Sequence, residues 1–183
     1  KKNIIFFNIN ELSKLENILN KRFFVKIKYS KLPKRLPIVL TKEEVVKVIN
    51  SIKNDKHRLM IKLMYSSGLR VSELINLRVQ DLDFDNNHGW VRHGKGNKDR
   101  LFVIAESLKD ELIKYIKNKA LDSFLFTSYN GRMSVRTLQV IIKKAVKEAN
   151  IKKDVHCHTL RHSYATHLIE NGYDVAAVQS LLG

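Results

Sequence analysis

The stretch HCHTLRHSYATHLIENG, residues 156–172, carries the clearest structural and chemical pattern in the chain. Its residues predict a helix over His158–Glu170 that ends near Asn171-Gly172. Arg161 lies three residues after His158, so the two side chains share one face of that helix. One guanidinium and one imidazole side by side can hold a phosphate and move a proton. The segment therefore indicates both a helical layer and a candidate phosphate site.

Two other interpretations of this stretch are open. The histidines could be core residues, and we expect Tyr164 and His167 to pack or hydrogen-bond inside the helix layer. Alternatively, His156, Cys157 and His158 could bind a metal, because His and Cys are dense here. Against a metal, the sequence has no CxxC partner, and the histidines lack the glutamate of HExxH. We therefore expect no metal site.

Helix signals recur on both sides of this stretch. Thr41-Lys-Glu-Glu44 is a capping box, Ser134 and Asp174 are expected helix caps, and Gly68 is a candidate left-handed helix end. Further helices are expected over about 57–66, in SELINL with Ser72 as its cap, and over about 107–119.

Strand signals are fewer. Gly89–His93 and Arg100–Ile104 flank a GKGNKD turn and predict a β-hairpin, and Phe124-Leu-Phe126 predicts a short strand. The predicted fold class is therefore mainly α with a small antiparallel β-sheet, an α+β fold.

Composition sets limits on the class of protein. The 183 residues include 34 Lys+Arg against 18 Asp+Glu, a net charge of +16, and 44% of residues are hydrophobic. That hydrophobic fraction excludes a disordered chain. No apolar run approaches the roughly 18 residues that a membrane span needs. The single cysteine, Cys157, allows no internal disulfide, which suits a cytoplasmic location.

The positive charge is concentrated at the start of the chain. Residues 1–40 hold ten Lys/Arg and two acidic residues, and KYSKLPKRLP, residues 28–37, contains both prolines. We interpret residues 1–37 as a basic lead-in and linker before a compact domain over 38–183. A basic excess of this kind favours a nucleic-acid partner, although a solvated lysine-rich surface is an alternative.

Two more segments could carry chemistry. Arg70 follows a helix end and precedes another helix, where a guanidinium suits bidentate phosphate contact and Glu73 could orient it; a surface ion pair is the alternative. In GKGNKDR, residues 94–100, the glycines let the backbone approach a ligand and Lys95 could donate a proton. That segment is not a Walker A loop, and a plain hairpin turn is the alternative.

In order along the chain, GLRVSEL (68–74), GKGNKDR (94–100), HTLRHSYATHLIENG (158–172) and VQSLLG (178–183) closely resemble the catalytic domain of the tyrosine recombinases. The resemblance covers about residues 38–183. It is greatest to the Xer branch and to related phage-type and archaeal integrases. It implies the DNA breaking-rejoining catalytic-domain fold. It also implies site-specific DNA recombination through a covalent 3′-phosphotyrosine, without metal, ATP or another cofactor.

The resemblance also implies residue roles. Arg70 and Arg161 would clamp the scissile phosphate, and Glu73 would be the acidic residue beside the first arginine. Lys95 would protonate the leaving 5′-oxygen, and His158 would be a general acid/base. The expected DNA-binding residues are Lys34, Arg35, Arg92, Lys98 and Arg100.

The chain departs from the family pattern at its end. After LLG the family continues with His or Trp and then the nucleophilic tyrosine, and none of the six tyrosines here lies in that context. We therefore expect this fragment to lack the nucleophile and to be inactive alone, and we expect residues 1–37 to include the end of a core-binding domain. The expected partners are double-stranded DNA at a specific site and further copies in a tetramer. The alternatives are a non-catalytic DNA-binding remnant and a type IB-like topoisomerase.

Overall fold

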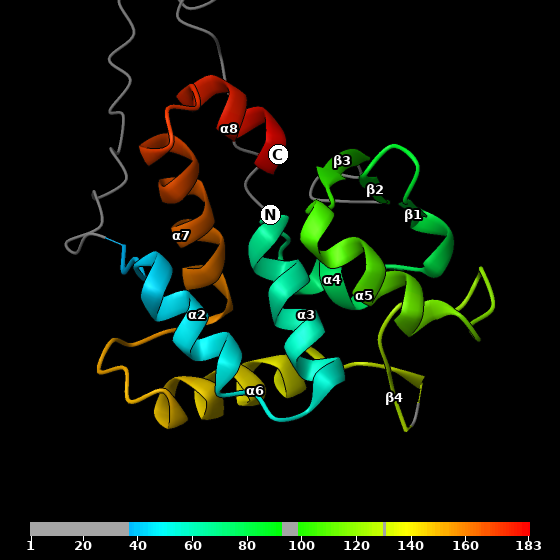
Figure 1. The fold of residues 1–183 in the computed structure, drawn as a ribbon, viewed down its shortest axis with the longest axis horizontal. Helices are drawn as coiled ribbons and strands as arrows, with labels where there is room; N and C mark the ends of the chain where they lie inside the picture. The colour runs from blue at the N-terminus through cyan, green and yellow to red at the C-terminus, as the bar shows by residue number, and fades with distance from the viewer. Residues whose placement is uncertain (1–36, 93–98, 130) are drawn as a thin grey trace, which may run out of the picture. The chain divides into compact units, whose positions relative to one another are not determined.

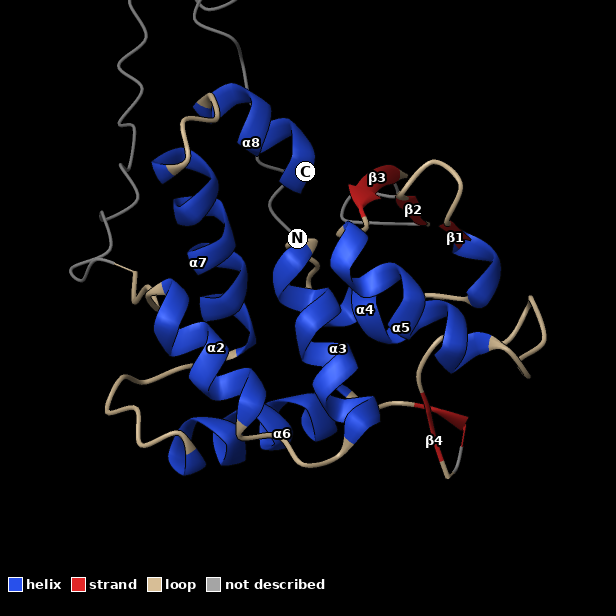
Figure 2. Cartoon of the chain, in the orientation of Figure 1, coloured by secondary structure: helices blue, strands red, loops and turns tan. Residues whose placement is uncertain are grey.

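The computed structural model of the chain describes residues 37–92, 99–129 and 131–183. Helices predominate in these ranges (Figures 1 and 2), as the sequence predicted. The helices are α2 (Lys42–Asn50), α3 (Asp55–Ser66), α4 (Val71–Asn76), α5 (Glu106–Ile116), α6 (Val135–Glu148), α7 (Cys157–Glu170) and α8 (Val175–Leu182), with a 3₁₀ turn at Val79–Asp81.

Two small antiparallel sheets accompany the helices. One has the order β1 (Leu82–Asp83), β2 (His88–Val91) and β3 (Arg100–Val103); the other pairs β4 (Thr127–Ser128) with β5 (Gly131–Arg132). Both strands of the expected hairpin are confirmed and pair with Trp90 opposite Leu101. The mainly α fold with small antiparallel sheets is thereby confirmed.

The expected strand at Phe124–Phe126 is wrong. Phe124 makes only an isolated bridge with Arg78, and strand β4 begins after Phe126. Leu125 and Phe126 are fully buried, and the Leu125 amide donates to the Leu77 carbonyl at 2.7 Å. The apolar run therefore anchors a buried bend, a pattern that periodicity cannot distinguish from a short strand.

Helix α3 lies at the centre of the core. Five of its residues are buried (Leu59, Met60, Ile61, Leu63 and Met64), so its apolar face is wide enough to contact several elements at once. It packs against α2, α4, α5 and α7, and Figure 1 shows it between α7 and α5, with α6 crossing below. The central helix ends immediately before the turn that carries Arg70.

Most predicted helix caps are confirmed. The Thr41 capping box has both of its hydrogen bonds, and Ser134 and Asp174 cap α6 and α8. The cap predicted at Ser72 is wrong, because α4 begins at Val71 and its cap is Arg70, two residues earlier. There the Arg70 amide donates to Glu73 Oε2 at 2.8 Å, so the third residue of the helix satisfies the amide of the cap residue.

Candidate active site

The turn after α3 places Arg70. Gly68 has a φ of +58°, which confirms the predicted left-handed helix end. A Cβ there would lie 2.5 Å from Leu182 Cδ2 and 2.7 Å from Tyr164 Cδ1, so α7 and α8 pack directly on this glycine. Figure 1 shows α8 folding back from α7 toward the turn. The three segments that carry Arg70, Arg161 and the chain end therefore meet at one point.

Glu73 is the centre of the site. It is only 7% exposed, and its Oε1 accepts a hydrogen bond from Arg70 Nη1 at 2.7 Å. Its Oε2 accepts from Arg100 Nη2 at 2.6 Å, and Arg161 Nη1 lies 3.9 Å from the same oxygen. Three guanidinium groups, from the start of α4, from β3 and from α7, thus surround one buried carboxylate.

The cluster holds more positive than negative charge. Burial alone would raise the pKa of Glu73, but hydrogen bonds from Arg100 and then from Arg70 outweigh it and leave the pKa below its usual value. Burial, with the nearby charges of Arg70 and Arg100, lowers the pKa of Arg161 to about 10. Glu73 and Arg161 are therefore both charged at neutral pH, and a guanidinium keeps its charge in proteins generally. Three cations and one anion leave a net charge of +2, which suits an anionic ligand.

The arginines also bind backbone oxygens at the end of α8. Arg161 Nη2 donates to the Leu182 carbonyl and Arg70 Nη2 to Gly183 O, both at 2.6 Å. Arg100 Nη1 donates to the Leu181 carbonyl at 2.9 Å. The last carbonyls of a helix have no partner within it and carry its negative partial charge. The same donors are therefore arranged to hold several oxygen atoms at once.

The motif HTLRHSYATHLIENG, which carries His158 and Arg161, lies mainly on α7, as expected. His158 is exposed in the first turn, and Arg161 is one turn further along, held by a 2.6 Å hydrogen bond from its Nη1 to the Gly68 carbonyl. His167 is buried and its Nδ1 lies 2.7 Å from Tyr65 Oη, which agrees with the expected packing role.

The structure separates the expected DNA-binding residues. Arg92 is exposed, and its guanidinium carbon lies 5.1 Å from the centre of the Trp90 ring. It also lies near the carboxylates of Asp81 and Asp99. Arg100 is instead part of the Glu73 cluster. Lys34, Arg35, Lys95 and Lys98 lie outside the described residues.

The place of Arg100 in the arginine cluster was not predicted from the sequence. Strand alternation is the signal that could have found it. Phe102 is a core residue, so Arg100, two residues before it, faces the same side, while Leu101 and Val103 are exposed.

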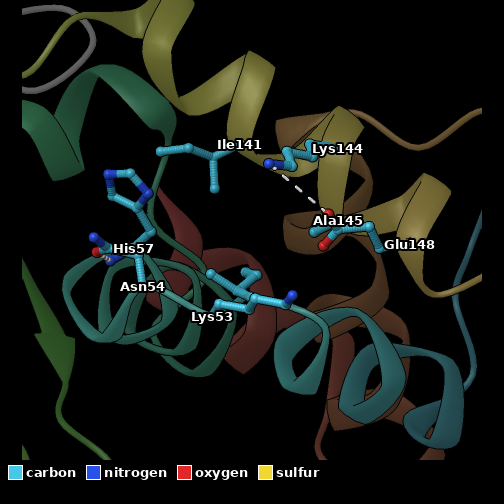
Figure 3. Close-up of a pocket in the computed structure, with 8 residues that line it drawn as sticks. Lys53, Asn54, His57, Ile141, Lys144, Ala145 and Glu148 are labelled. Atoms are coloured by element: carbon cyan, nitrogen blue, oxygen red, sulfur yellow. Dashed lines mark hydrogen bonds and ion pairs between the residues drawn. The ribbon is translucent and has the colours of Figure 1, made fainter.

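Other features lie away from this cluster. A groove of about 290 Å³ between α6 and the α2–α3 connection is lined by Lys53, His57 and Lys144 among others (Figure 3), and contains none of the predicted site residues. In the part of the chain that the structure describes, no three His, Cys, Asp or Glu side chains gather as a metal site. No helix within the same ranges is long and apolar enough to cross a membrane.

The chain is similar to known proteins along most of its length. The model of the phage integrase family matches residues 38–183. Tyrosine recombinase XerA of Pyrococcus horikoshii is 39% identical over 163 residues, which cover 86% of this chain and 56% of that protein. A tyrosine recombinase of Thermosipho africanus is 41% identical over 183 residues, 97% of this chain and 63% of that protein. The chain thus spans about three-fifths of the length of these curated relatives.

Solved structures agree with the sequence matches. A crystal structure of XerA recombinase superposes with a TM-score of 0.74 at 29% identity, covering 95% of this chain and 64% of that one. XerH site-specific recombinase bound to difH substrate, in a pre-cleavage complex, superposes with a TM-score of 0.67 at 26% identity. The match covers 89% of this chain and 51% of the XerH chain. Together with the family match over residues 38–183, these similarities show that this chain belongs to the phage integrase family, with the Xer tyrosine recombinases among its relatives.

Proposed function

We propose that residues 38–183 form the catalytic domain of a site-specific tyrosine recombinase, which cleaves and rejoins DNA through a covalent 3′-phosphotyrosine. The observation that carries the proposal is the cluster of Arg70, Arg100 and Arg161 around the buried carboxylate of Glu73. Its net positive charge, in a chain similar to named tyrosine recombinases, fits one phosphodiester of DNA.

The chemistry explains why fixed arginines matter. When a phosphodiester is attacked in line, negative charge develops on its non-bridging oxygens. Guanidinium donors that are already oriented stabilise this charge without having to reorganise. In this proposal Arg70 and Arg161 hold the scissile phosphate, His158 acts as general acid/base, and Lys95 protonates the leaving 5′-oxygen. The attacking tyrosine would come from outside the 183 residues.

The partners follow from the same proposal. XerH, one of the similar structures, is described in complex with its difH substrate. We infer that this chain binds double-stranded DNA at a specific site and assembles as a tetramer on paired sites, in the cytoplasm where DNA is accessible. Residues 1–37, with Lys34 and Arg35, would contact the DNA backbone and lead from an N-terminal core-binding domain.

The test is covalent trapping. The reading frame that encodes this chain is expressed in full and incubated with a nicked duplex carrying its own recombination site. We expect a protein–DNA adduct that survives SDS. Arg161→Ala should lower its rate of formation by about two to three powers of ten, because one preorganised donor is removed. Lys144→Ala, which removes an exposed cation from α6, is the control and should leave the rate unchanged.

Two outcomes would contradict the proposal. Specific DNA binding without any adduct from the wild-type protein would favour a non-catalytic DNA-binding protein of the same fold. An adduct that forms equally well with Arg161→Ala would remove Arg161 from the phosphate site.

A further inference from the structure

Arg100 is a charged residue in an unusual place. It begins β3, yet its side chain is only 12% exposed and points to the same side as the fully buried Phe102. Arginine is almost never buried to this degree without a partner. Arg161 is buried to the same degree, and what distinguishes Arg100 from it is the direct 2.6 Å hydrogen bond that Arg100 donates to Glu73, where Arg161 lies 3.9 Å away.

The partners of Arg100 come from two other elements. Its Nη2 donates to Glu73 Oε2 in α4 at 2.6 Å, and its Nη1 donates to the Leu181 carbonyl in α8 at 2.9 Å. Its aliphatic part packs against Gly183, where an added Cβ would lie 2.8 Å from Arg100 Cδ. One side chain therefore joins the strand that follows the hairpin turn to α4 and α8.

The contact with Glu73 has a geometric consequence for Arg70. Glu73 Oε1 binds the Arg70 guanidinium and Oε2 binds both the Arg70 amide and Arg100. With Arg100 in place, both carboxylate oxygens are fixed, so the plane of the carboxylate and the direction of Arg70 Nη1 are fixed too. The hydrogen bond from Arg100 is the largest single contact that lowers the pKa of Glu73, followed by the two hydrogen bonds from Arg70. Without Arg100, Oε2 would keep only the Arg70 amide as a hydrogen-bond donor, so the carboxylate and the Arg70 guanidinium bound to it would be held less firmly.

We propose that Arg100 is a positioning residue of the phosphate site: it fixes the Glu73 carboxylate, and through it the Arg70 guanidinium, and it seats the last turn of α8 against the same cluster. This inference rests on the proposed recombinase function. Arg100 itself touches no phosphate, and it acts only through the groups that do.

The test compares rate with affinity. In the protein expressed from the full reading frame, Arg100→Met is measured for adduct formation at saturating DNA and for site binding at several salt concentrations. Misplacing Arg70 should slow adduct formation by about 100-fold, the cost of a misplacement near 1 Å. The slope of log K against log[salt] should stay unchanged, because removing one phosphate neutralisation would make it shallower by about 0.9. Arg92→Met, at the exposed end of the same hairpin, shows how the salt slope responds when a cation that we expect to contact the DNA backbone is removed.

A double-mutant cycle tests whether Arg100 acts through Glu73. If Arg100 acts through Glu73, the rate losses of Arg100→Met and Glu73→Gln should not multiply in the double variant. Arg100→Lys keeps the charge but not the planar two-point contact, so it should recover only part of the rate. It also provides the same readouts if Arg100→Met does not fold.

Each result that would contradict these proposals leads to a different conclusion. A wild-type protein that forms no adduct would defeat the recombinase proposal itself. A wild type that is active, with Arg100 variants that keep its rate at saturating DNA, would overturn the positioning role. A salt slope that is shallower by about 0.9 at an unchanged saturating rate would make Arg100 a DNA-backbone contact instead.

Discussion

Glu73 is the residue on which the cluster depends. A carboxylate this well buried would normally favour its neutral form, but Arg100 and Arg70 donate hydrogen bonds to both of its oxygens. The result is an anion that holds cations in place while leaving the cluster with a positive excess. The sequence could predict that Glu73 orients Arg70. It could not predict the third arginine, because the contact joins residues 27 positions apart.

Replacing Glu73 should therefore change stability in a pH-dependent way. At pH 7 we expect Glu73→Gln to lower the free energy of unfolding by about 3 kcal/mol, because the arginines would be left without their buried partner. Since folding lowers the pKa of Glu73 below 4.5, its contribution is complete above pH 4.5 and disappears as the pH falls through the folded-state pKa. The difference between wild type and variant should shrink accordingly. Urea unfolding followed by circular dichroism from pH 7 to pH 3 measures it, and a difference independent of pH would contradict the assignment.

At the scale of elements, local signals predicted most helices and failed where long-range contacts decide. The Thr41, Ser134 and Asp174 caps act within one turn, so the sequence alone was enough. The predicted cap of α4 at Ser72 was wrong because the cap position is taken by Arg70, whose side chain is not a typical cap and whose amide is bonded instead by Glu73 inside the helix. The Phe124–Phe126 segment was misread because burial of an apolar run does not identify its backbone conformation.

The meeting of α3, α7 and α8 at Gly68 gives an element-scale prediction. Gly68→Ala should destabilise the chain by about 3 kcal/mol, from left-handed strain together with overpacking against Leu182 and Tyr164. Gly172→Ala is the matched control. It also has a positive φ, but an added Cβ would meet no atom within 4 Å, so the substitution should cost only about 1 kcal/mol. Thermal unfolding of both variants measures the difference, and equal destabilisation would show that the packing at Gly68 is not tight.

For the whole molecule, the cations behind the net charge of +16 are assigned to different roles in our account. Three arginines are committed to the Glu73 cluster, two of them proposed to hold one phosphate. Other cations, such as exposed Arg92, belong to the set that we propose contacts the DNA backbone. The sequence predicted the family and the pair of arginines through motifs whose spacing is local. It could not predict how α8 folds back onto the site, because that depends on packing between helices that are distant in sequence.

The central claim is that Arg161 neutralises charge on the scissile phosphate. It is tested most directly by DNA in which a methyl group replaces one non-bridging oxygen of that phosphate and so removes its negative charge. On ordinary DNA, Arg161→Ala should slow adduct formation by about 100- to 1,000-fold. On the methylated DNA the variant should approach the wild-type rate, because no anionic charge remains to be stabilised. An equally large decrease on both substrates would contradict the account.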